Sequence, residues 1–509
     1  MEATGTDTRK NEMKYEKSEL ELMSTYQLRE ICRREKIMNG VIHPLDKEEL
    51  IQTIMRYMGK RQDFLICDRK KGGEERVEEF LKNTRIVIKP SEELYCQSQI
   101  LAYEGLSIEY YDDYTIPYKK ELAGTNAFLM GSDKTLCAIL NLKEHGGKQE
   151  KLYLTKAAEL ETRETQRKDY RIFCMGRQNS ECMYHLYYGE QTILPEHIEV
   201  YSIPLIDFVV RKPVTLMLPM AIDFGSVNTT AGVYLDSAYF EHVGQQAAIK
   251  NCRENEINYT VFEDGAGESM LLPSVIGVLA VEEEDYKLLF GYDAIRLANA
   301  SYVDEGFCVF YDVKRWIGEY DKEEEIVDRQ GRRRLVKRAE ILRRFFLYII
   351  RKTENRFKCR ISQVHISSPV KQKHYFRRMF RDILPEYMIN QEIMLDEGMA
   401  VLYNTISNML EQETLEENEE YEALIIDCGG GTTDLCSYRF RIQDRRAAYK
   451  IYMETTYENG DTDFGGNNIT YRIMQILKIA LVRATGNQNV SSVKEILEYM
   501  DTDIYRFID

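Results

Sequence analysis

Two segments of the chain share one pattern, in which an apolar strand ends in aspartate and turns sharply into a second strand. The first is LMLPMAIDFGSVNTTAGVYLD, where Gly225 closely follows Asp223. The second is YEALIIDCGGGTTDLCSYRF, where three glycines closely follow Asp427. Glycines weaken a strand hairpin, so a run of three indicates close backbone approach to a ligand rather than a plain glycine-rich hairpin. The pattern predicts two hairpins whose turns hold a bound group.

Both turns offer donors that suit phosphate oxygens, because glycine exposes backbone N–H groups and hydroxyls stand beside them. The candidate ligand-binding residues are Gly225, Ser226, Asn228, Thr229, Gly429, Gly430, Gly431 and Thr432. Asp223 and Asp427, together with Asp434, suit a hydrated Mg²⁺, which keeps several waters and takes carboxylates and nucleotide phosphates as ligands.

These turns resemble the phosphate loops of the actin, hexokinase and 70-kDa heat-shock chaperone superfamily. Further segments narrow the resemblance to the heat-shock 70 branch: LLPSVIGV with KLLFGYDAIRLANA, VFYDVKRWIGEYD, ISQVHISSPV with MLDEGMAVLYN, and ENGDTDFGGNNITYRI. The matches keep the family order and cover roughly half of the chain. The resemblance implies an α/β fold of actin-like (ribonuclease H-like) ATPase lobes, with ATP and Mg²⁺ bound between them.

The same resemblance implies roles for residues around the phosphates. Asp223 and Asp427 would face the metal-bound phosphates. Ser226 would replace a loop threonine near the γ-phosphate, and Thr432 would lie beside the phosphates. Hydrolysis of a phosphoanhydride depends mostly on positioning and charge stabilisation, which this set of groups can supply.

The implied catalytic residues are Lys314, Glu397 and Asp434. Lys314 would orient or polarise the attacking water, and the two carboxylates would serve the metal waters and the nucleophilic water. The alternative for Lys314 alone is a surface lysine, but its setting in DVKRWIG, with the only Trp of the chain, favours the functional role. Glu397 can be a helix N-terminal carboxylate that the helix dipole favours.

The chain departs from the family pattern at several points. Val227 stands where a second hydroxyl is usual, Gly398 replaces a proline, and Phe464 replaces a smaller aliphatic residue. We find no adenosine-binding motif and no peptide-binding sandwich after Gly466. We therefore expect a nucleotide-binding domain that is incomplete at its C-terminus, completed by a partner, or degenerate.

The N-terminal region has a different character. Residues 1–20 are polar and expected to be disordered, whereas 21–60 predict two short helices around a loop with Pro44. The first helix has Ser24 or Thr25 as its cap, and the second has Asp46. The pair resembles a SAP-like helix-loop-helix module, which often binds nucleic acid; the alternative is a helical pair that docks protein. The candidate phosphate contacts are Arg29, Arg33, Arg34, Lys36 and Lys47.

Residues 61–215 predict a strand-rich mixed α+β accessory domain without a chemical motif. The strand-like runs are TRIVIK, YRIFCM, MYHLYY and IEVYSI. A further charged stretch follows at 329–344, where eight cations come shortly after the acidic run 321–325. We expect a salt-bridged hairpin there rather than a nucleic-acid patch.

Composition excludes several classes of protein. The net charge of −16 opposes a bulk nucleic-acid coat protein. Charged residues interrupt the most apolar stretch, 203–224, which therefore predicts consecutive buried strands and no membrane span. The N-terminus lacks the apolar core of a secretory signal, and the 11 cysteines form no CxxC pair. We expect reduced thiols and a cytoplasmic protein.

The leading hypothesis is an ATP-binding, ATP-hydrolysing heat-shock-70-like protein that acts as a nucleotide-switched chaperone or adaptor. Its nucleotide-binding domain would occupy 216–509, and a protein client or partner, not identified by the sequence, would be engaged through 61–215. The alternative is a pseudo-ATPase scaffold, or a nucleic-acid-associated regulator that uses 21–60. The VFYDVKRWIGEYD match to the chaperone branch disfavours an actin-like filament.

Overall fold

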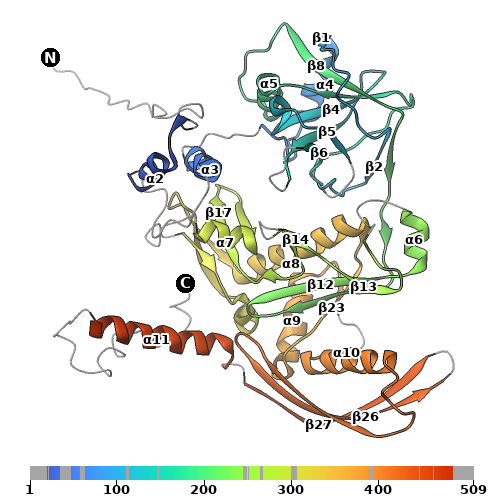
Figure 1. Ribbon diagram of the computed structural model, residues 1–509, viewed down its shortest axis with the longest axis vertical. Coiled ribbons are helices and arrows are strands. Elements are labelled where there is room, and N and C mark those ends of the chain that lie inside the picture. Colours follow the sequence, from blue (N-terminus) through green and yellow to red (C-terminus); the bar gives the residue numbers. More distant parts are fainter. Residues whose placement is uncertain are drawn as a thin grey trace. The chain divides into compact units, whose positions relative to one another are not determined.

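The computed structural model describes a mixed α/β protein (Figure 1). The described residues are 20, 22–34, 47–57, 64–110, 114–145, 150–244, 249, 251–263, 267–299, 307–389, 395–445, 448–461 and 464–484. Contacts within the chain divide it into two compact units, Met1–Lys212 with Ala298–Glu305 and Pro213–Leu297 with Gly306–Asp509. None of the helices described is long and apolar enough to cross a membrane.

The two predicted N-terminal helices are present as α2, Thr25–Arg34, and α3, Lys47–Tyr57. Ser24 caps α2: its Oγ accepts the Gln27 N–H at 3.3 Å, and Gln27 Oε1 accepts the Ser24 N–H at 2.8 Å. The buried stripe between the helices consists of Leu28, Ile31, Cys32, Leu50, Ile51, Ile54 and Met55. The predicted cap Asp46 lies outside the described residues, as does all of 1–20 except Leu20.

A seven-stranded mixed sheet forms the rest of the first unit, in the order β1-β8-β7-β4-β5-β6-β3. Only the β1–β8 pair is parallel. The strands are β1 Arg85–Ile88, β3 Thr115–Pro117, β4 Thr125–Gly131, β5 Leu136–Lys143, β6 Lys151–Thr155, β7 Tyr170–Cys174 and β8 His197–Leu205. Helices α4, Gly73–Asn83, and α5, Arg177–Tyr188, contribute to the core on one face. The other core takes in the parallel ladder of β2, Gln99–Tyr103, and β9, Asp207–Arg211.

The prediction of a strand for MYHLYY is wrong, because this run forms the second half of α5. Its buried side chains include Ser180, Met183, Tyr184 and Tyr187, which are spaced as on one face of a helix. Gly189, with φ of 76°, ends the helix in the left-handed conformation. Packing against the sheet therefore overrides the strand preference of tyrosine. The other three runs form β1, β7 and β8, as predicted.

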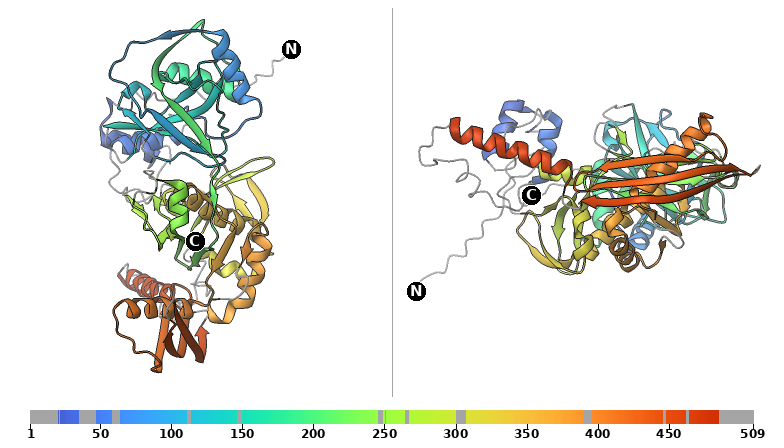
Figure 2. Two further views of the ribbon diagram at one scale, coloured as in Figure 1. Left: turned by 90° about the vertical axis from the view of Figure 1, so that its right-hand side faces the viewer. Right: turned by 90° about the horizontal axis from the view of Figure 1, so that it is seen from below.

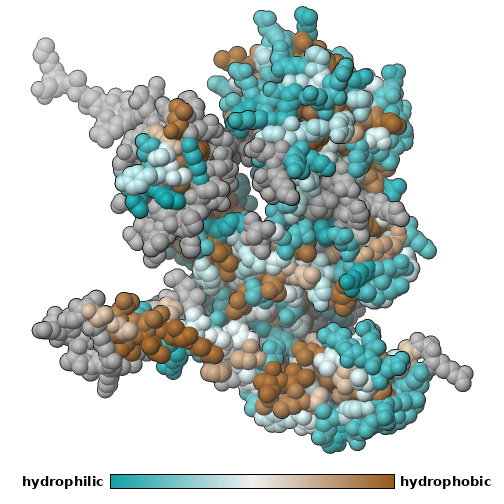
Figure 3. Space-filling view, viewed as in Figure 1, coloured by the Kyte–Doolittle hydropathy of each residue, from teal (hydrophilic) through white to brown (hydrophobic). Residues whose placement is uncertain are grey.

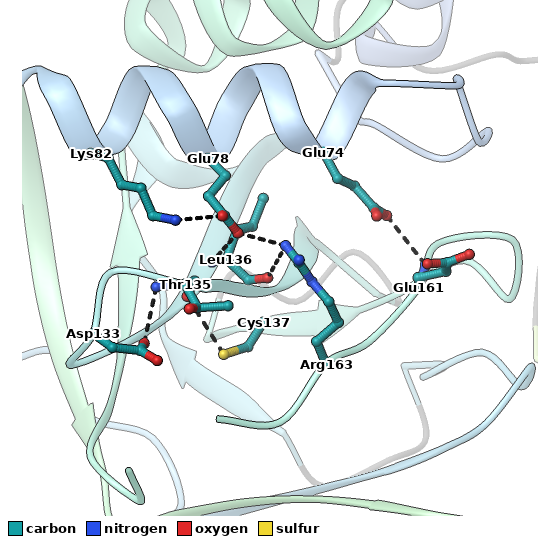
Figure 4. A network of polar contacts seen from close by, with 9 residues as sticks. All are labelled: Glu74, Glu78, Lys82, Asp133, Thr135, Leu136, Cys137, Glu161 and Arg163. Atoms are coloured by element: carbon teal, nitrogen blue, oxygen red, sulfur yellow. Dashed lines mark hydrogen bonds and ion pairs between the residues drawn. The ribbon is translucent and has the colours of Figure 1, made fainter. Parts of the chain in front are cut away.

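Figure 4 shows how α4 is attached to the sheet. The Glu78 carboxylate accepts the Leu136 N–H at 2.9 Å and bonds to Lys82 and Arg163, each at 2.6 Å. These partners lower the pKa of Glu78 and outweigh the effect of burial, which raises it. The network links helix α4 to the start of β5 and to the loop that carries Arg163.

The second unit begins with a sheet in the order β13-β12-β11-β23-β24. The strands are β11 Met220–Phe224, β12 Asn228–Leu235, β13 Glu256–Tyr259, β23 Gln363–Ile366 and β24 Met388–Ile389, with β16 Leu272–Pro273 added to β12. Strands β11, β12 and β13 form an antiparallel meander, whereas β23 and β24 run parallel to β11. Helices α8, Arg338–Phe357, and α9, Lys373–Ile383, contribute phenylalanines that pack on Phe224.

A second, three-stranded antiparallel sheet follows along the chain. Its strands are β25 Tyr421–Cys428, β26 Thr433–Asp444 and β27 Tyr449–Asp461, which lie side by side in the right-hand view of Figure 2. Helix α10, Glu397–Glu411, covers one face through Leu402 and Ile406. The last described helix is α11, Gly466–Ala484, which exposes Ile469, Ile473, Ile476 and Leu477 (Figure 3).

The expected salt-bridged hairpin is confirmed as β20, Glu323–Val327, and β21, Arg333–Lys337. Arg333 bonds to Glu325 at 2.9 Å across the strands, and Arg332 bonds to the buried Asp328 at 2.7 Å. The other helices and strands described in this unit are α6 Ser237–Val243, α7 Tyr292–Asn299, β10 Val214–Thr215, β14 Phe262–Glu263, β15 Glu268–Ser269, β17 Ile276–Val281, β18 Tyr286–Phe290, β19 Val309–Phe310 and β22 Cys359–Arg360. In the described part of the chain, the 3₁₀ segments are η1 Lys120–Leu122, η4 Val313–Glu319 and η5 Val370–Gln372.

Candidate functional site

The two predicted Asp–Gly hairpins form, and they share one strand register. In the first, Asp223 of β11 pairs with Thr230 of β12; in the second, Asp427 of β25 pairs with Asp434 of β26. The turns close in the same way. The Gly225 N–H donates to the Asn228 carbonyl at 3.1 Å, and the Gly429 N–H donates to the Thr432 carbonyl at 2.9 Å. The chain therefore contains two copies of one strand-turn-strand unit.

The two turns meet each other inside the second unit. A Cβ on Gly430 would lie 2.4 Å from Val227 Cγ2, and a Cβ on Gly431 would lie 3.0 Å from Ser226 Oγ. Contacts this short exclude a side chain at Gly430 unless Val227 moves. The glycine run thus permits turn-to-turn contact, and the sequence-predicted residues of both turns lie in one place.

Ser274 holds the first turn in shape. Its Oγ donates to the Gly225 carbonyl at 2.7 Å, and its N–H donates to the Val227 carbonyl at 2.8 Å. Its hydroxyl also lies 2.9 Å from Thr229 Oγ1, and both side chains are fully buried. The Thr229 hydroxyl is therefore engaged in the core, whereas Ser274 is a site residue that sequence reasoning missed. The LLPSV segment was its only signal.

The N-terminus of α11 holds the second turn. The Gly466 and Asn467 N–H groups donate to the Gly429 and Gly430 carbonyls at 2.9 and 2.8 Å. Gly465 packs so closely that an added Cβ would lie 2.5 Å from the Gly430 carbonyl oxygen. Hydrogen bonds and close packing therefore couple this turn to the first turn of α11.

Lys314 lies beside the turns as part of η4 and is only 5% exposed. Its Nζ donates to Glu397 Oε1 at 2.8 Å, and both side chains are largely buried. Burial is the largest cause that raises the pKa of Glu397, to about 7, and the charges of Asp223 and Asp434 add to it. The Lys314 ammonium opposes this shift. A buried ammonium and a carboxyl that titrates near neutrality thus form one pair.

Asp434 is the second buried carboxylate of the site, with 3% exposure. Its pKa is raised, mainly by burial, and the charge of Asp427 contributes to the rise while Lys314 opposes it. Its Oδ2 atom has no hydrogen-bond partner among the residues that the structure describes. A buried acceptor without a partner is costly, so this atom is suited to a bound water or ligand.

Asp223 and Asp427 have different surroundings. Asp223 Oδ1 accepts the Ser367 hydroxyl at 2.9 Å, at the point where β23 ends beside β11. In the part of the chain that the structure describes, no group donates a hydrogen bond to Asp427. Both carboxylates stand at strand ends next to the turns, as the sequence predicts.

Sequence reasoning missed the support behind Glu397. Asp396 caps α10 by accepting the Met399 N–H at 2.6 Å, and it is itself buried. Tyr438 donates to Asp396 Oδ1 at 3.0 Å, and Lys373 lies 3.0 Å from Oδ2. Aspartate directly before an apolar helical run is a cap signal that could have identified Asp396. This network fixes the first turn of α10 and hence the Glu397 side chain.

These residues fit a hydrated Mg²⁺ with a phosphate ligand better than a metal caged by protein. No group of three or more metal-ligating side chains occurs among the residues described. Mg²⁺ needs no such cage, since it retains waters and takes one or two carboxylates plus substrate phosphates. The unpartnered Asp434 Oδ2 agrees with this type of site.

Comparison with known proteins assigns no family to this chain, because no family model and no curated protein sequence matches it.

Proposed function

We propose that the second unit binds ATP with Mg²⁺ and hydrolyses its terminal phosphoanhydride, as an actin-like ATPase of the 70-kDa heat-shock type. The observation that carries this proposal is the meeting of two equivalent Asp–Gly turns beside one buried Lys314–Glu397 pair. Two matched hairpins are what a pair of nucleotide-binding lobes would contribute.

The binding groups come from both turns. Asp223 and Asp427 would hold the hydrated Mg²⁺, which supplies charge neutralisation to the phosphates when it is bound. Backbone N–H groups of the turns and the Ser226 and Thr432 side chains would contact phosphate oxygens. Because the turns touch through Val227 and Gly430, phosphates would enter as the turns separate.

Two groups of this chain would act on the attacking water. Glu397, with its pKa raised to about 7, is suited to accept a proton from that water near neutral pH. Lys314 would fix the carboxylate and stabilise the negative charge that develops on transfer. The free Oδ2 of Asp434 would accept a hydrogen bond from a water of the metal or from the nucleophile.

The link between the second turn and α11 supports a nucleotide-switched role. The Gly429 and Gly430 carbonyls accept from the first residues of α11, so a turn displaced by phosphate would displace this helix. A protein that reads the position of α11 would then distinguish the bound from the free state. We propose a chaperone-like or adaptor activity on this basis.

Calorimetry of the full chain with ATP, with and without Mg²⁺, tests binding. We expect Mg²⁺-dependent binding in the wild type and its loss in Asp427→Ala. Lys314→Ala should still bind ATP but should no longer hydrolyse it, as measured by the release of inorganic phosphate. No binding by the wild type would refute the proposal. Binding without hydrolysis in the wild type would instead support the pseudo-ATPase scaffold.

A further inference from the structure

Equivalent positions of the two hairpins differ sharply in burial. The register places Met220 and Ile222 of β11 where Leu424 and Ile426 stand in β25. Met220 and Ile222 are 0% and 2% exposed, whereas Leu424 and Ile426 are 62% and 66% exposed. Two aliphatic side chains on one face of a strand are thus left in water at positions that are core in the other copy.

In the first copy, helices α8 and α9 pack on the sheet face that carries Met220 and Ile222, and a neighbouring strand flanks both residues. Strand β23 pairs with the outer edge of β11 in parallel, with Met220 opposite Val364 and Ile222 opposite Ile366. Among the described residues, no strand pairs with the outer edge of β25. This edge spans eight residues, contains neither lysine nor proline, and pairs with β26 without a bulge. Its charged residues, Glu422 and Asp427, stand towards its two ends, so its middle lacks the lysine, proline or bulge that protects many free edges from pairing.

We propose that β25 is a docking edge for a strand presented by another polypeptide. The first copy defines the chemistry of that strand. It runs parallel to β25 and places aliphatic side chains at the positions of Val364 and Ile366, beside Leu424 and Ile426. It carries a hydroxyl at the position of Ser367, which would donate to Asp427 as Ser367 donates to Asp223. This inference is independent of nucleotide binding.

Cys428, at the end of β25, provides the test. It is the exposed cysteine among the chain's 11. By the first-copy register, it lies opposite the position of Ser368. The probe is a peptide with the sequence of residues 361–367, ISQVHIS, followed by a C-terminal cysteine. The full chain is mixed with the peptide in a series of buffers with increasing 2-mercaptoethanol concentration. Intact-mass spectrometry then measures the fraction of the chain that carries the peptide as a disulfide.

We expect the strand peptide to stay attached at about tenfold more reductant than a scrambled peptide with the same terminal cysteine, because edge pairing adds to the tether. A peptide N-methylated at alternate amides should lose this advantage. Ile426→Asp should lose it too, whereas Ile257→Asp, at a similarly exposed position on β13, should keep it. Cys428→Ser should abolish tethering, which would show that the disulfide forms at this thiol.

Equal retention of the scrambled or N-methylated peptide would overturn the proposal. Two other occupants would also overturn it. A dimer in sedimentation velocity that blocks tethering at Cys428 would assign the edge to a second copy. A gain of tethering when the chain is shortened after Ala484 would assign the edge to residues 485–509.

Discussion

The first and second Asp–Gly hairpins are built alike and packed differently. Each places an aspartate at the end of its first strand and closes its turn with the same backbone hydrogen bond. Strand β11 is flanked by β12 and β23, whereas β26 is the one strand that pairs with β25 among the residues described. Local sequence thus sets the hairpin, and more distant segments decide whether its aliphatic face becomes core.

The largest expected effect separates the two copies at one equivalent position. Ile222→Asp would bury an unpaired charge at a position that is 2% exposed, so we expect loss of cooperative folding. Ile426→Asp, at 66% exposure, should change the unfolding free energy by less than about 0.5 kcal/mol. Urea unfolding followed by circular dichroism measures both. Equal damage would show that the face of β25 is already covered in the free protein.

The second effect concerns the ion pair beside the turns. Lys314→Ala leaves Glu397 buried without its ammonium and should cost about 3–5 kcal/mol of unfolding free energy at pH 8. The loss should be smaller at pH 6, where Glu397 can take up a proton. In the Lys314→Ala background, the further change Glu397→Gln should recover part of the lost unfolding free energy. A lysine that contributes nothing at either pH would contradict the buried pair.

The third effect is the pH dependence that Glu397 imposes on stability. Its pKa rises from 4.5 to about 7 on folding, so the folded chain binds the proton more tightly between these values. The contribution of this group to the unfolding free energy therefore falls as pH rises from about 4.5 to about 7. Glu397→Gln should flatten that slope in urea titrations across this range. An unchanged slope would mean that the pH dependence of the unfolding free energy comes from other groups, such as Asp434, whose pKa is also raised.

The fourth effect compares the first glycine of each turn. A Cβ at Gly225 would lie 2.3 Å from the Asn228 carbonyl oxygen, whereas one at Gly429 would lie 3.4 Å from that of Thr432. Gly225→Ala should therefore destabilise by about 1–3 kcal/mol, and Gly429→Ala by less than about 1 kcal/mol. Thermal unfolding of the two variants side by side decides the matter. The reverse order would contradict the difference in Cβ distance between the two turns.

The smallest effect tests the hydrogen bond that only the first copy has. Ser367→Ala removes the donor to Asp223 and should cost about 0.5–1.5 kcal/mol. Ser362→Ala, just before the start of β23, serves as the matched control. The Ser362 hydroxyl donates to a backbone carbonyl at 3.3 Å, which is a long and weak hydrogen bond. If both variants were equally stable, the Ser367 bond would contribute nothing measurable.

The sequence predicted the elements that carry strong local signals. The hairpins at Asp223 and Asp427, the two N-terminal helices and the charged hairpin at 323–337 all form where expected. Each depends on alternation, capping or turn residues within a short window, and such signals act before the chain folds. The helix at 177–188 was missed because its six-residue tyrosine-rich run has no local preference strong enough to resist packing.

Sequence alone placed Asp223, Asp427, Lys314 and Glu397 among the candidates, because their residue types and neighbours form recognisable patterns. Only the tertiary structure decided that Lys314 and Glu397 bond to each other and that Ser274 supports the first turn. It also decided that Asp396 caps helix α10, whose first residue is Glu397. These contacts join residues far apart in the chain, with the exception of the Asp396 cap. Their energies arise from burial and desolvation, which a linear pattern does not specify. For the same reason, the sequences of β11 and β25 are alike in pattern, while only the folded chain reveals that one is buried and the other exposed.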